Sequence, residues 1–294
     1  MNDITKIQNE TPSITMLKAQ RKLYRHAKNI AYASFGIFVL PVVMGNIAKY
    51  WLVDNTTYMY VLIAYSGLAA ILKVVLSEWG KCIKKKSALI QQVFDTHVFG
   101  LSWQKHWGKK PTAEEINAIA HEEPNTKLLD WYETSIGKAN HDVGILLCQM
   151  ESISYDGRLK KIFYWAIHVF FGLLVAVDII YGVCNYHDSV RCFFFYSFIP
   201  LSPMIVWYAY LLINRKNEND LRQKLELLTS DAWEIALSKQ EIPICDLVVI
   251  QDTLLRYRQT GNAVPDVIYF NQRNKQEGIA YESIKDRLRE LGID

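Results

Sequence analysis

Hydrophobic residues along the chain gather into four long blocks in which charged residues are almost absent. A helix that crosses a bilayer needs about 20 predominantly apolar residues. A helix of that length in a soluble protein would normally present a polar face to water. The pattern therefore predicts four membrane-spanning helices, at residues 29–48, 55–72, 162–184 and 192–214, with the apolar character of the second continuing to Leu76.

Lys and Arg residues concentrate on one side of these four blocks. They precede the first and third blocks and follow the second and fourth, whereas the two short connecting segments hold only Lys49 and Arg191. Because loops rich in Lys and Arg remain in the cytoplasm, both termini are expected there. The predicted organisation is a cytoplasmic segment at 1–28, two spans within 29–78, a cytoplasmic insert at 79–161, two spans within 162–214 and a cytoplasmic region at 215–294.

The polar regions carry helix signals of their own. Thr112 and Glu115, directly after Pro111, have the spacing of a capping box at a helix start. No strong helix breaker separates a helix beginning near His141 from the third span, because Gly157 alone costs only about 1 kcal/mol. One long helix is therefore expected to run from the cytosol into the membrane. The predicted fold class is all-α: a four-helix transmembrane bundle with a helical cytoplasmic insert and a helical C-terminal cytoplasmic region.

The fourth span continues without Pro or Gly into residues 219–237. Apolar residues there follow a 4,3,4,3 spacing, which is typical of a short coiled-coil seam. The seam residues are Leu221, Leu225, Leu228, Ala232 and Ile235. Two interpretations are open: packing against the insert within one chain, or contact between subunits of an oligomer. Further helices are predicted at 245–259 and 275–291, with a turn at 261–265 between them.

Composition excludes several classes of function. The chain has 33 Lys and Arg against 30 Asp and Glu, so its overall charge points to no particular partner. It contains no GxGxxG, Walker A, HExxH or GxSxG motif. Its histidines occur singly, and its cysteines show no spacing typical of a metal site. The sequence therefore predicts no enzyme activity, no metal site and no cofactor.

Three residues inside the predicted spans are candidates for a pore or gate. Asp178 is either a pore-lining carboxylate that selects cations or an interfacial residue that reaches water or pairs with Lys49. Pro200 and Pro203 lie close together in the fourth span, and each removes a backbone donor and favours a bend. A bent span is one way to build a gate.

Cys184 and Cys192 flank the short segment between the third and fourth spans. They are either bridged, if the segment faces an oxidising compartment, or free thiols near helix ends. Both states are left open by the sequence.

Aromatic and basic side chains are interleaved in the cytoplasmic insert. They include Trp103, Trp131, Tyr132 and Tyr155 among Lys105, Lys109, Lys110, Arg158 and Lys160. Aromatic faces stack on bases and cations neutralise phosphates, so a small nucleotide pocket needs both. The alternative is that these aromatic residues form an interfacial belt or belong to the core.

Short motifs occur in a fixed order around the four spans. They are Gln20-Arg21 with Tyr24, the run from Gln91 to Asp95 with Trp103, Trp131-Tyr132, Cys148-Gln149, Tyr155-Asp156 with Lys160, and Arg256 and Arg258 followed by Asp266 and Tyr269. This order resembles the SMODS-associating four-transmembrane effectors of CBASS-type bacterial anti-phage systems. The resemblance covers most of the chain from about residue 19 to 270.

The resemblance implies an effector paired with an enzyme that makes cyclic oligonucleotides on phage infection. The nucleotide is expected to bind the cytosolic region, after which the spans rearrange, breach the inner membrane and arrest growth. Implied partners are this ligand, the lipid bilayer and further copies of the chain, because four helices leave little room for a pore; no nucleic acid polymer is expected. The expected ligand-binding residues are Trp103, Trp131, Tyr132, Gln149, Tyr155, Asp156, Arg158, Lys160, Arg256 and Arg258.

The chain also departs from the family pattern near the third span. Met150 stands where a basic residue is expected and Ser152 where Asn is expected. Tyr155 replaces Trp, and Lys160 replaces Arg, whose planar bidentate fork Lys cannot reproduce. If those Arg and Asn positions contact the ligand in relatives, this chain is expected to prefer a different ligand or to bind it elsewhere. The alternative function is a constitutive ion channel or small-solute transporter that no nucleotide gates.

Overall fold

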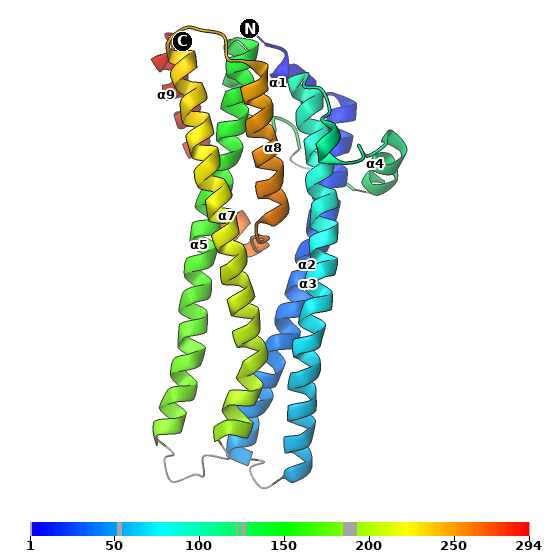
Figure 1. The fold of residues 1–294 in the computed structure, drawn as a ribbon, viewed down its shortest axis with the longest axis vertical. Coiled ribbons are helices and arrows are strands. Elements are labelled where there is room, and N and C mark those ends of the chain that lie inside the picture. Colours follow the sequence, from blue (N-terminus) through cyan, green and yellow to red (C-terminus); the bar gives the residue numbers. More distant parts are fainter. Residues whose placement is uncertain (1, 52–54, 122, 125–127, 185–192, 294) are drawn as a thin grey trace.

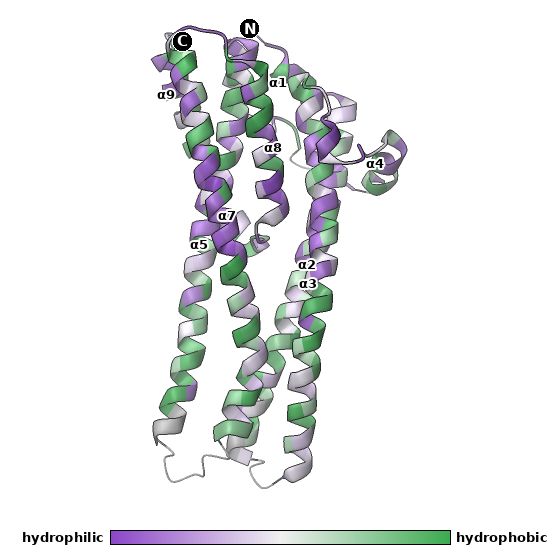
Figure 2. Ribbon diagram, in the orientation of Figure 1, coloured by the Kyte–Doolittle hydropathy of each residue, from purple (hydrophilic) through white to green (hydrophobic). Residues whose placement is uncertain are grey.

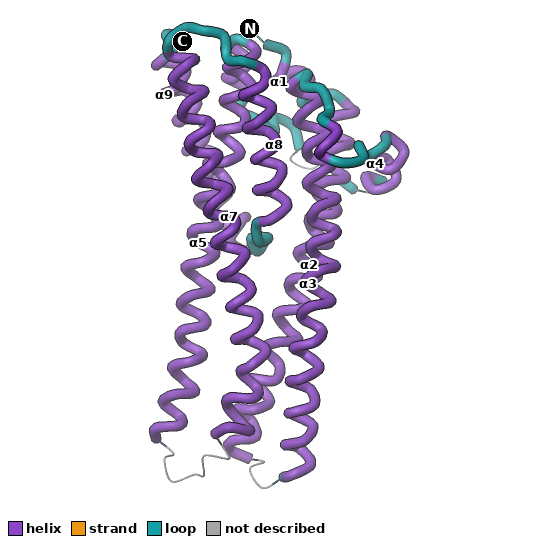
Figure 3. The backbone as a smooth tube through the Cα atoms, in the orientation of Figure 1, coloured by secondary structure: helices purple, strands orange, loops and turns teal. Residues whose placement is uncertain are grey.

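The computed structural model describes residues 2–51, 55–121, 123–124, 128–184 and 193–293 (Figure 1). Within these ranges the chain is helical and has no strand (Figure 3), which confirms the all-α prediction. The α-helices are α1 Ile4–Ile7, α2 Thr11–Trp51, α3 Thr56–Phe99, α4 Ala113–Ala120, α5 His141–Cys184, α7 Ile199–Leu237, α8 Ile244–Thr260 and α9 Asp266–Glu290. Short 3-10 turns occur at η1 Lys105–Trp107 and η2 Thr134–Lys138, and a π-helical turn at η3 Phe194–Phe198.

Four helices, α2, α3, α5 and α7, run along the length of the molecule (Figure 1), and each is long and apolar enough to cross a membrane. Their apolar residues gather at one end, while both termini lie at the other (Figures 1 and 2). We call the described residues within 29–51, 55–76, 162–184 and 193–214 the apolar half, and the remaining described residues the polar half. α5 runs unbroken through Gly157, as its sequence predicts.

One helix start lies where the local sequence predicts it, and another does not. The predicted capping box is confirmed at α4: Thr112 Oγ1 accepts a hydrogen bond from the Glu115 amide, and Glu115 Oε2 accepts one from the Thr112 amide, both at 3.2 Å. α9 begins directly after Pro265, earlier than periodicity predicts. The reason is tertiary, because Ile268 and Tyr269 in its first turn pack against a cluster formed largely by α5.

The largest hydrophobic core lies in the polar half. It joins buried residues of α3, α5, α7, α8 and α9, such as Phe94, Leu146, Leu225 and Ile284. Leu225 and Ala232 belong to this core, and the other seam residues of α7 pack against it. The seam therefore packs within one chain, which is the first of the two interpretations that the spacing left open.

Close helix packing marks the far end of the apolar half. A Cβ atom placed on Gly45 of α2 would lie 2.6 Å from the carbonyl oxygen of Tyr196 and 2.8 Å from Cγ of Pro200, so only glycine fits there. Pro200 and Pro203 are both buried. The π-helical turn η3 directly precedes them, and Pro200 lacks the amide that would donate back into it.

Two predictions fall on residues outside this description. The segment 185–192, which includes Cys192, is not described, and neither is the side chain of Lys49. The Cys184–Cys192 bridge and the pairing of Asp178 with Lys49 therefore stay predictions.

Candidate functional site

A cavity of about 540 Å³ lies in the polar half. Its walls come from α2, α3, α5, α8, α9 and the loop at residues 129–133. Small-molecule sites in proteins commonly enclose about 300–1,000 Å³. Three of its helices, α2, α3 and α5, continue beyond the cavity into the apolar half. The cavity is therefore large enough for a small ligand and is built on helices that reach the predicted spans.

Aromatic and charged side chains dominate the cavity lining. The aromatic residues are Tyr24, Trp131, Tyr132, Tyr155, Tyr257 and Tyr269. The cations are Arg21, Lys28, Lys84, Lys160, Arg258 and Arg273, and the acids are Asp130, Glu133, Glu151, Asp156 and Glu277. Because cations and acids nearly balance, the pairing of each cation decides what charge the cavity presents to a ligand.

Several of these cations already have carboxylate partners. Lys160 pairs with Asp156 of its own helix and with Glu218 of α7, and its ammonium lies 4.1 Å from the centre of the Tyr257 ring. Lys28 pairs with Asp266 at 2.5 Å. These pairs tie α2 to the start of α9 and α5 to α7 around the cavity.

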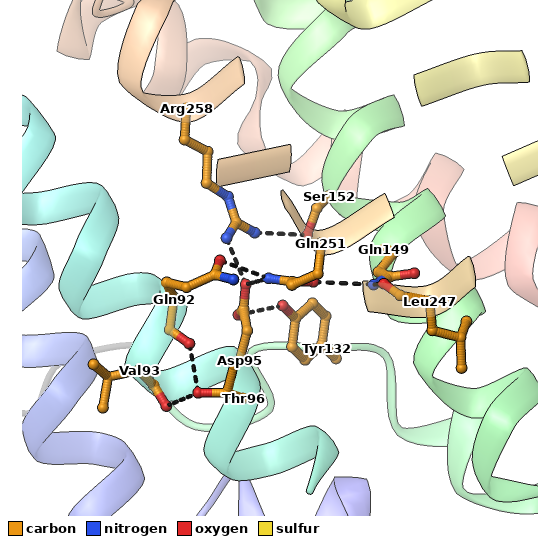
Figure 4. Close-up of polar contacts among 10 residues, drawn as sticks. All are labelled: Gln92, Val93, Asp95, Thr96, Tyr132, Gln149, Ser152, Leu247, Gln251 and Arg258. Carbon is orange, nitrogen blue, oxygen red and sulfur yellow. Dashed lines mark hydrogen bonds and ion pairs between the residues drawn. The ribbon is translucent and has the colours of Figure 1, made fainter. Parts of the chain in front are cut away.

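A buried polar network supports one wall of the cavity (Figure 4). Asp95 of α3 is fully buried; it accepts hydrogen bonds from the Tyr132 hydroxyl and the Gln251 side-chain amide, both at 2.8 Å, and pairs with Arg258. Gln149 donates to the Gln251 side-chain oxygen at 3.0 Å. A buried carboxylate needs such partners to offset its lost hydration. The network thereby holds Tyr132 and Arg258, which both line the cavity, in one arrangement.

Two cavity residues change protonation near neutral pH. Burial and the neighbouring Lys160 ammonium lower the pKa of Lys84, which is 9% exposed, to about 7. Burial raises the pKa of the Glu151 carboxyl to about 7 as well. Protonation of both groups makes the cavity more positive, so mild acid favours an anionic ligand.

Hydroxyl groups supply neutral donors and acceptors. Burial, with the nearby Asp156 carboxylate, raises the pKa of Tyr24, which keeps its phenol protonated. Burial, with the nearby Asp156 and Glu218 carboxylates, likewise raises the pKa of Tyr257 and keeps its phenol protonated.

The structure brings together six of the ten residues that the sequence proposes as ligand contacts. They are Trp131, Tyr132, Tyr155, Asp156, Lys160 and Arg258. They come from the 129–133 loop, α5 and α8, so their proximity is a consequence of the tertiary fold.

The other four proposed contacts do not line this cavity. Trp103 donates its indole N–H to the Gly108 carbonyl at 3.0 Å and packs edge-on against Trp107. Gln149 lies in the buried network. Arg158 donates to Gln276 of α9, and exposed Arg256 pairs with Asp252 one turn earlier on α8. Their role as ligand contacts stays a prediction.

Sequence reasoning left several lining residues out of the proposed contacts. They are Arg21, Tyr24, Lys28, Lys84, Tyr257, Tyr269 and Arg273. Arg21, Tyr24 and Tyr269 stand in the motifs that carry the family resemblance, so a signal for them was present. Lys84 is one of a run of lysines after the second span, and nothing local distinguishes it from its neighbours.

The three pore or gate candidates lie in the apolar half. Asp178 is only 6% exposed within a single chain, and Pro200 and Pro203 are also buried. Burial within a single chain does not test whether Asp178 lines a pore or whether Pro200 and Pro203 form a gate, so both roles stay predictions.

The described fold is that of a multi-pass membrane protein with a cavity-bearing polar half. The family model for the SMODS-associating 4TM effector domain matches residues 2–286, which is nearly the whole chain, and the chain belongs to this family. It is thus a membrane effector of the CBASS-associated class, which pairs with SMODS-type cyclic oligonucleotide synthases. Neither a curated protein nor a solved structure matches the chain.

Proposed function

We propose that this protein is a bacterial anti-phage effector that binds a cyclic oligonucleotide in the 540 Å³ cavity and then disrupts the inner membrane by forming a pore. Growth arrest or cell death before phage release follows from the loss of membrane integrity. The chain acts without catalysing a reaction and without a cofactor. It works as a homo-oligomer, because one bundle of four helices encloses little space.

The convergence of separate motifs on one cavity carries this proposal. The motif residues that line it are Gln20, Arg21, Tyr24, Gln91, Trp131, Tyr132, Tyr155, Asp156, Lys160, Arg258 and Tyr269. They stand in stretches far apart in the sequence and on different helices. The cavity is the place where these stretches meet, which supports a shared role in holding one ligand.

The lining suits the chemistry of a cyclic oligonucleotide. Aromatic faces such as those of Trp131 and Tyr155 stack on bases, and such stacking is worth about 1–3 kcal/mol per base. Arg21 and Lys84 stand in the same lining as cations for the phosphates. Carboxylates in the lining, such as Asp156, accept hydrogen bonds from base N–H groups when they are ionised.

Helix continuity supports a mechanical link from cavity to membrane. α2, α3 and α5 each contribute lining residues and then continue into the apolar half without a break. A ligand shifts a conformational equilibrium only by its differential affinity for the two states, and a shift from 1:99 to 99:1 needs a difference of about 10⁴-fold. Residues on three spanning helices give one ligand the contacts through which such a difference arises.

The proposed orientation puts the cavity and both termini in the cytoplasm. It rests on the Lys and Arg bias around the spans. The fold supports it, since both termini lie at the polar end of the molecule (Figure 1). A nucleotide made by a cytosolic synthase would then reach the cavity directly.

Subunit contacts are proposed to use the outer face of α5. In the most apolar window of this helix only 17% of residues are buried, against 39% for the fourth span. Trp165, Leu173 and Val177 are large and exposed there. Such a face contacts either lipid or another copy of the chain. Assembly on activation would replace its lipid contacts with contacts to another copy.

Binding is tested with detergent-purified protein and a panel of cyclic di- and trinucleotides in a thermal-shift assay. A ligand at about 100 times its dissociation constant should add about 2.7 kcal/mol of stability. Trp131→Leu and Arg21→Gln should weaken the response. Trp79→Leu and Arg25→Gln are matched controls, because neither residue lines the cavity and Arg25 pairs with Glu123 one turn from Arg21. Equal losses in the controls, or no response to any nucleotide, would contradict the proposal.

Membrane disruption is tested by release of dye from vesicles that contain the protein. Release should require the nucleotide identified in the binding assay. Release without nucleotide would instead support a constitutive channel or transporter. Asp178→Asn should change the ratio of cation to anion flux if the carboxylate lines the open pore, whereas an unchanged ratio would assign Asp178 a structural role.

A further inference from the structure

A second cavity, of about 860 Å³, lies where the polar half meets the apolar half. Its walls come from α2, α3, α5 and α7, together with the end of α8 and the turn that leads into α9. It therefore lies at the depth where the ends of the predicted spans would meet the headgroups of a bilayer. This position matters because the two ends of the cavity differ sharply in chemistry.

The polar end of this cavity is basic. One face of α3 supplies Lys81, Lys84 and Lys85 at helical spacing, and α8 adds Arg256, which pairs with Asp252 of its own helix. Among the described lining residues there is no Asp or Glu. Lys81 pairs with Glu78 at 2.7 Å. Lys73 lies deeper, over the Phe38 ring, and donates to Ser77 at 2.7 Å. Lys84 and Lys85 have no ion-pair partner in the described part of the chain.

The other end of the cavity is apolar and aromatic. Phe35 of α2, Phe163, Ile167 and Phe170 of α5, and Trp207 of α7 line it. Apart from Lys73, the side chains in this part of the lining offer hydrocarbon and aromatic surface. The cavity as a whole is amphipathic over the length of a few helical turns.

We propose that this cavity binds one anionic phospholipid, with its phosphate at the α3 lysines and acyl chain among the aromatic residues. A free phosphate would account for the cations but leave the apolar end uncovered. A zwitterionic lipid would account for the apolar end but leave an excess of positive charge. Basic pockets between membrane helices at the cytoplasmic side are a known way to hold anionic headgroups. Bound lipid would connect α2, α3, α5 and α7.

The site also adjoins the first cavity. Lys84 lines both cavities and is largely buried between them. A phosphate on the lipid side and an anionic ligand on the other would then share one ammonium group. The lipid proposal does not depend on the nucleotide proposal, since the lysine face and the aromatic pocket exist in either case.

The test uses full-length protein in nanodiscs and native mass spectrometry. Nanodiscs that contain phosphatidylglycerol should yield one retained anionic lipid per chain, and phosphatidylcholine should be retained far less. Equal retention of the two lipids would overturn the proposal. Soluble glycerol phosphate is the second arm: stabilisation by it that equals the effect of phosphatidylglycerol would show a phosphate site rather than a lipid site.

Matched variants separate this site from general surface charge. Lys85→Gln should weaken phosphatidylglycerol retention about fivefold, the effect of one Lys near an anionic surface. Lys86→Gln removes the same charge from the next position, which is exposed and does not line the cavity, and should leave retention unchanged. An equal loss in Lys86→Gln would overturn the proposal in favour of general surface electrostatics.

A second pair tests the apolar end. Ala166→Trp should fill the cavity and lower lipid retention, while Ala176→Trp, at an exposed position of the same helix, should not. Both variants should keep the wild-type helical circular dichroism signal. Retention unaffected by Ala166→Trp in folded protein would show that no acyl chain enters this cavity.

Discussion

The polar and apolar halves of this molecule are held together in different ways. The polar half has one large core, with residues such as Phe94 and Leu225 fully buried, and a buried network around Asp95. The apolar half has small clusters, and large side chains such as Ile71 and Leu173 are more than 60% exposed. In a bilayer no hydrophobic force drives apolar helices together, because lipid tails are equally apolar.

This difference suggests a division of labour. A densely packed region moves as a unit, because interiors transmit strain instead of absorbing it. A loosely packed helix bundle exchanges neighbours at low cost, because lipid or another subunit replaces the lost contacts. The polar half is thus suited to sense a ligand, and the apolar half is suited to rearrange.

The largest expected loss of stability comes from a substitution in the core of the polar half. Leu225→Asp should destabilise the protein by more than about 5 kcal/mol, because it removes core packing and buries an unpaired carboxylate. Leu227 lies two residues away on α7 and is 67% exposed. Leu227→Asp should change stability by less than about 0.5 kcal/mol. Thermal unfolding in detergent measures both, and an effect of Leu225→Asp no larger than that of Leu227→Asp would contradict the packing of the seam in the core of a single chain.

A somewhat smaller effect is expected from the buried network. Arg258→Met should cost about 3–5 kcal/mol, because it leaves the buried Asp95 carboxylate without its cation. Arg256→Met on the same helix breaks a solvent-exposed pair with Asp252 and should cost about 0–1 kcal/mol. Thermal unfolding again provides the measurement. Similar losses in the two variants would show that the network adds nothing beyond a surface ion pair.

In the apolar half, specific packing is expected at the contact between α2 and α7. Gly45→Ala should cost about 1–3 kcal/mol, because the new methyl group collides with Tyr196 and Pro200. Gly36→Ala on the same helix meets no atom within 4 Å and should be neutral or slightly stabilising. Thermal inactivation in nanodiscs would compare them. Equal thermal inactivation of the two variants would mean that the contact of Gly45 with Tyr196 and Pro200 loosens in the membrane.

The smallest expected effect concerns pH. Between pH 8 and pH 6, Lys84 gains its charge and Glu151 loses its charge, since both pKa values lie at about 7. A ligand that binds only one protonation state of a group gains up to about tenfold in affinity over this range. Affinity for an anionic ligand should therefore rise as pH falls.

Calorimetry of ligand binding at both pH values measures this effect. Lys84→Met and Glu151→Gln should each remove part of the pH dependence. Groups around Lys84 include Lys160, Asp156 and Glu218, and the Glu133 amide donates to Glu151 at 3.1 Å. Affinity that rises with pH would contradict the assigned roles of both residues.

Several elements were predictable from the sequence because their cause is local. A run of apolar residues identifies a span whatever surrounds it. Thr112 and Glu115 are close enough in the chain to cap a helix without outside help. The unbroken α5 follows from the weakness of Gly157 as a helix breaker. In each case the residues that interact are neighbours in the sequence.

The candidate site was only partly predictable. Trp103 and Trp131 occur in the same insert and in similar company, yet only Trp131 lines the cavity. Arg258 lines it, while Arg256 on the same helix faces elsewhere and pairs with Asp252. Composition and spacing do not say which face of a helix meets a cavity, because that depends on how the helices pack.

The sequence by itself determined the four apolar helices, the all-α class and the family, since hydropathy and motif order are properties of a linear chain. Only the tertiary structure placed Lys84 between two cavities and brought Tyr24, Trp131 and Tyr269 to one of them. It also assigned the Leu225 seam to the core of a single chain. The physical reason is that a cavity is formed by residues far apart in sequence, whose meeting depends on the packing of every helix between them.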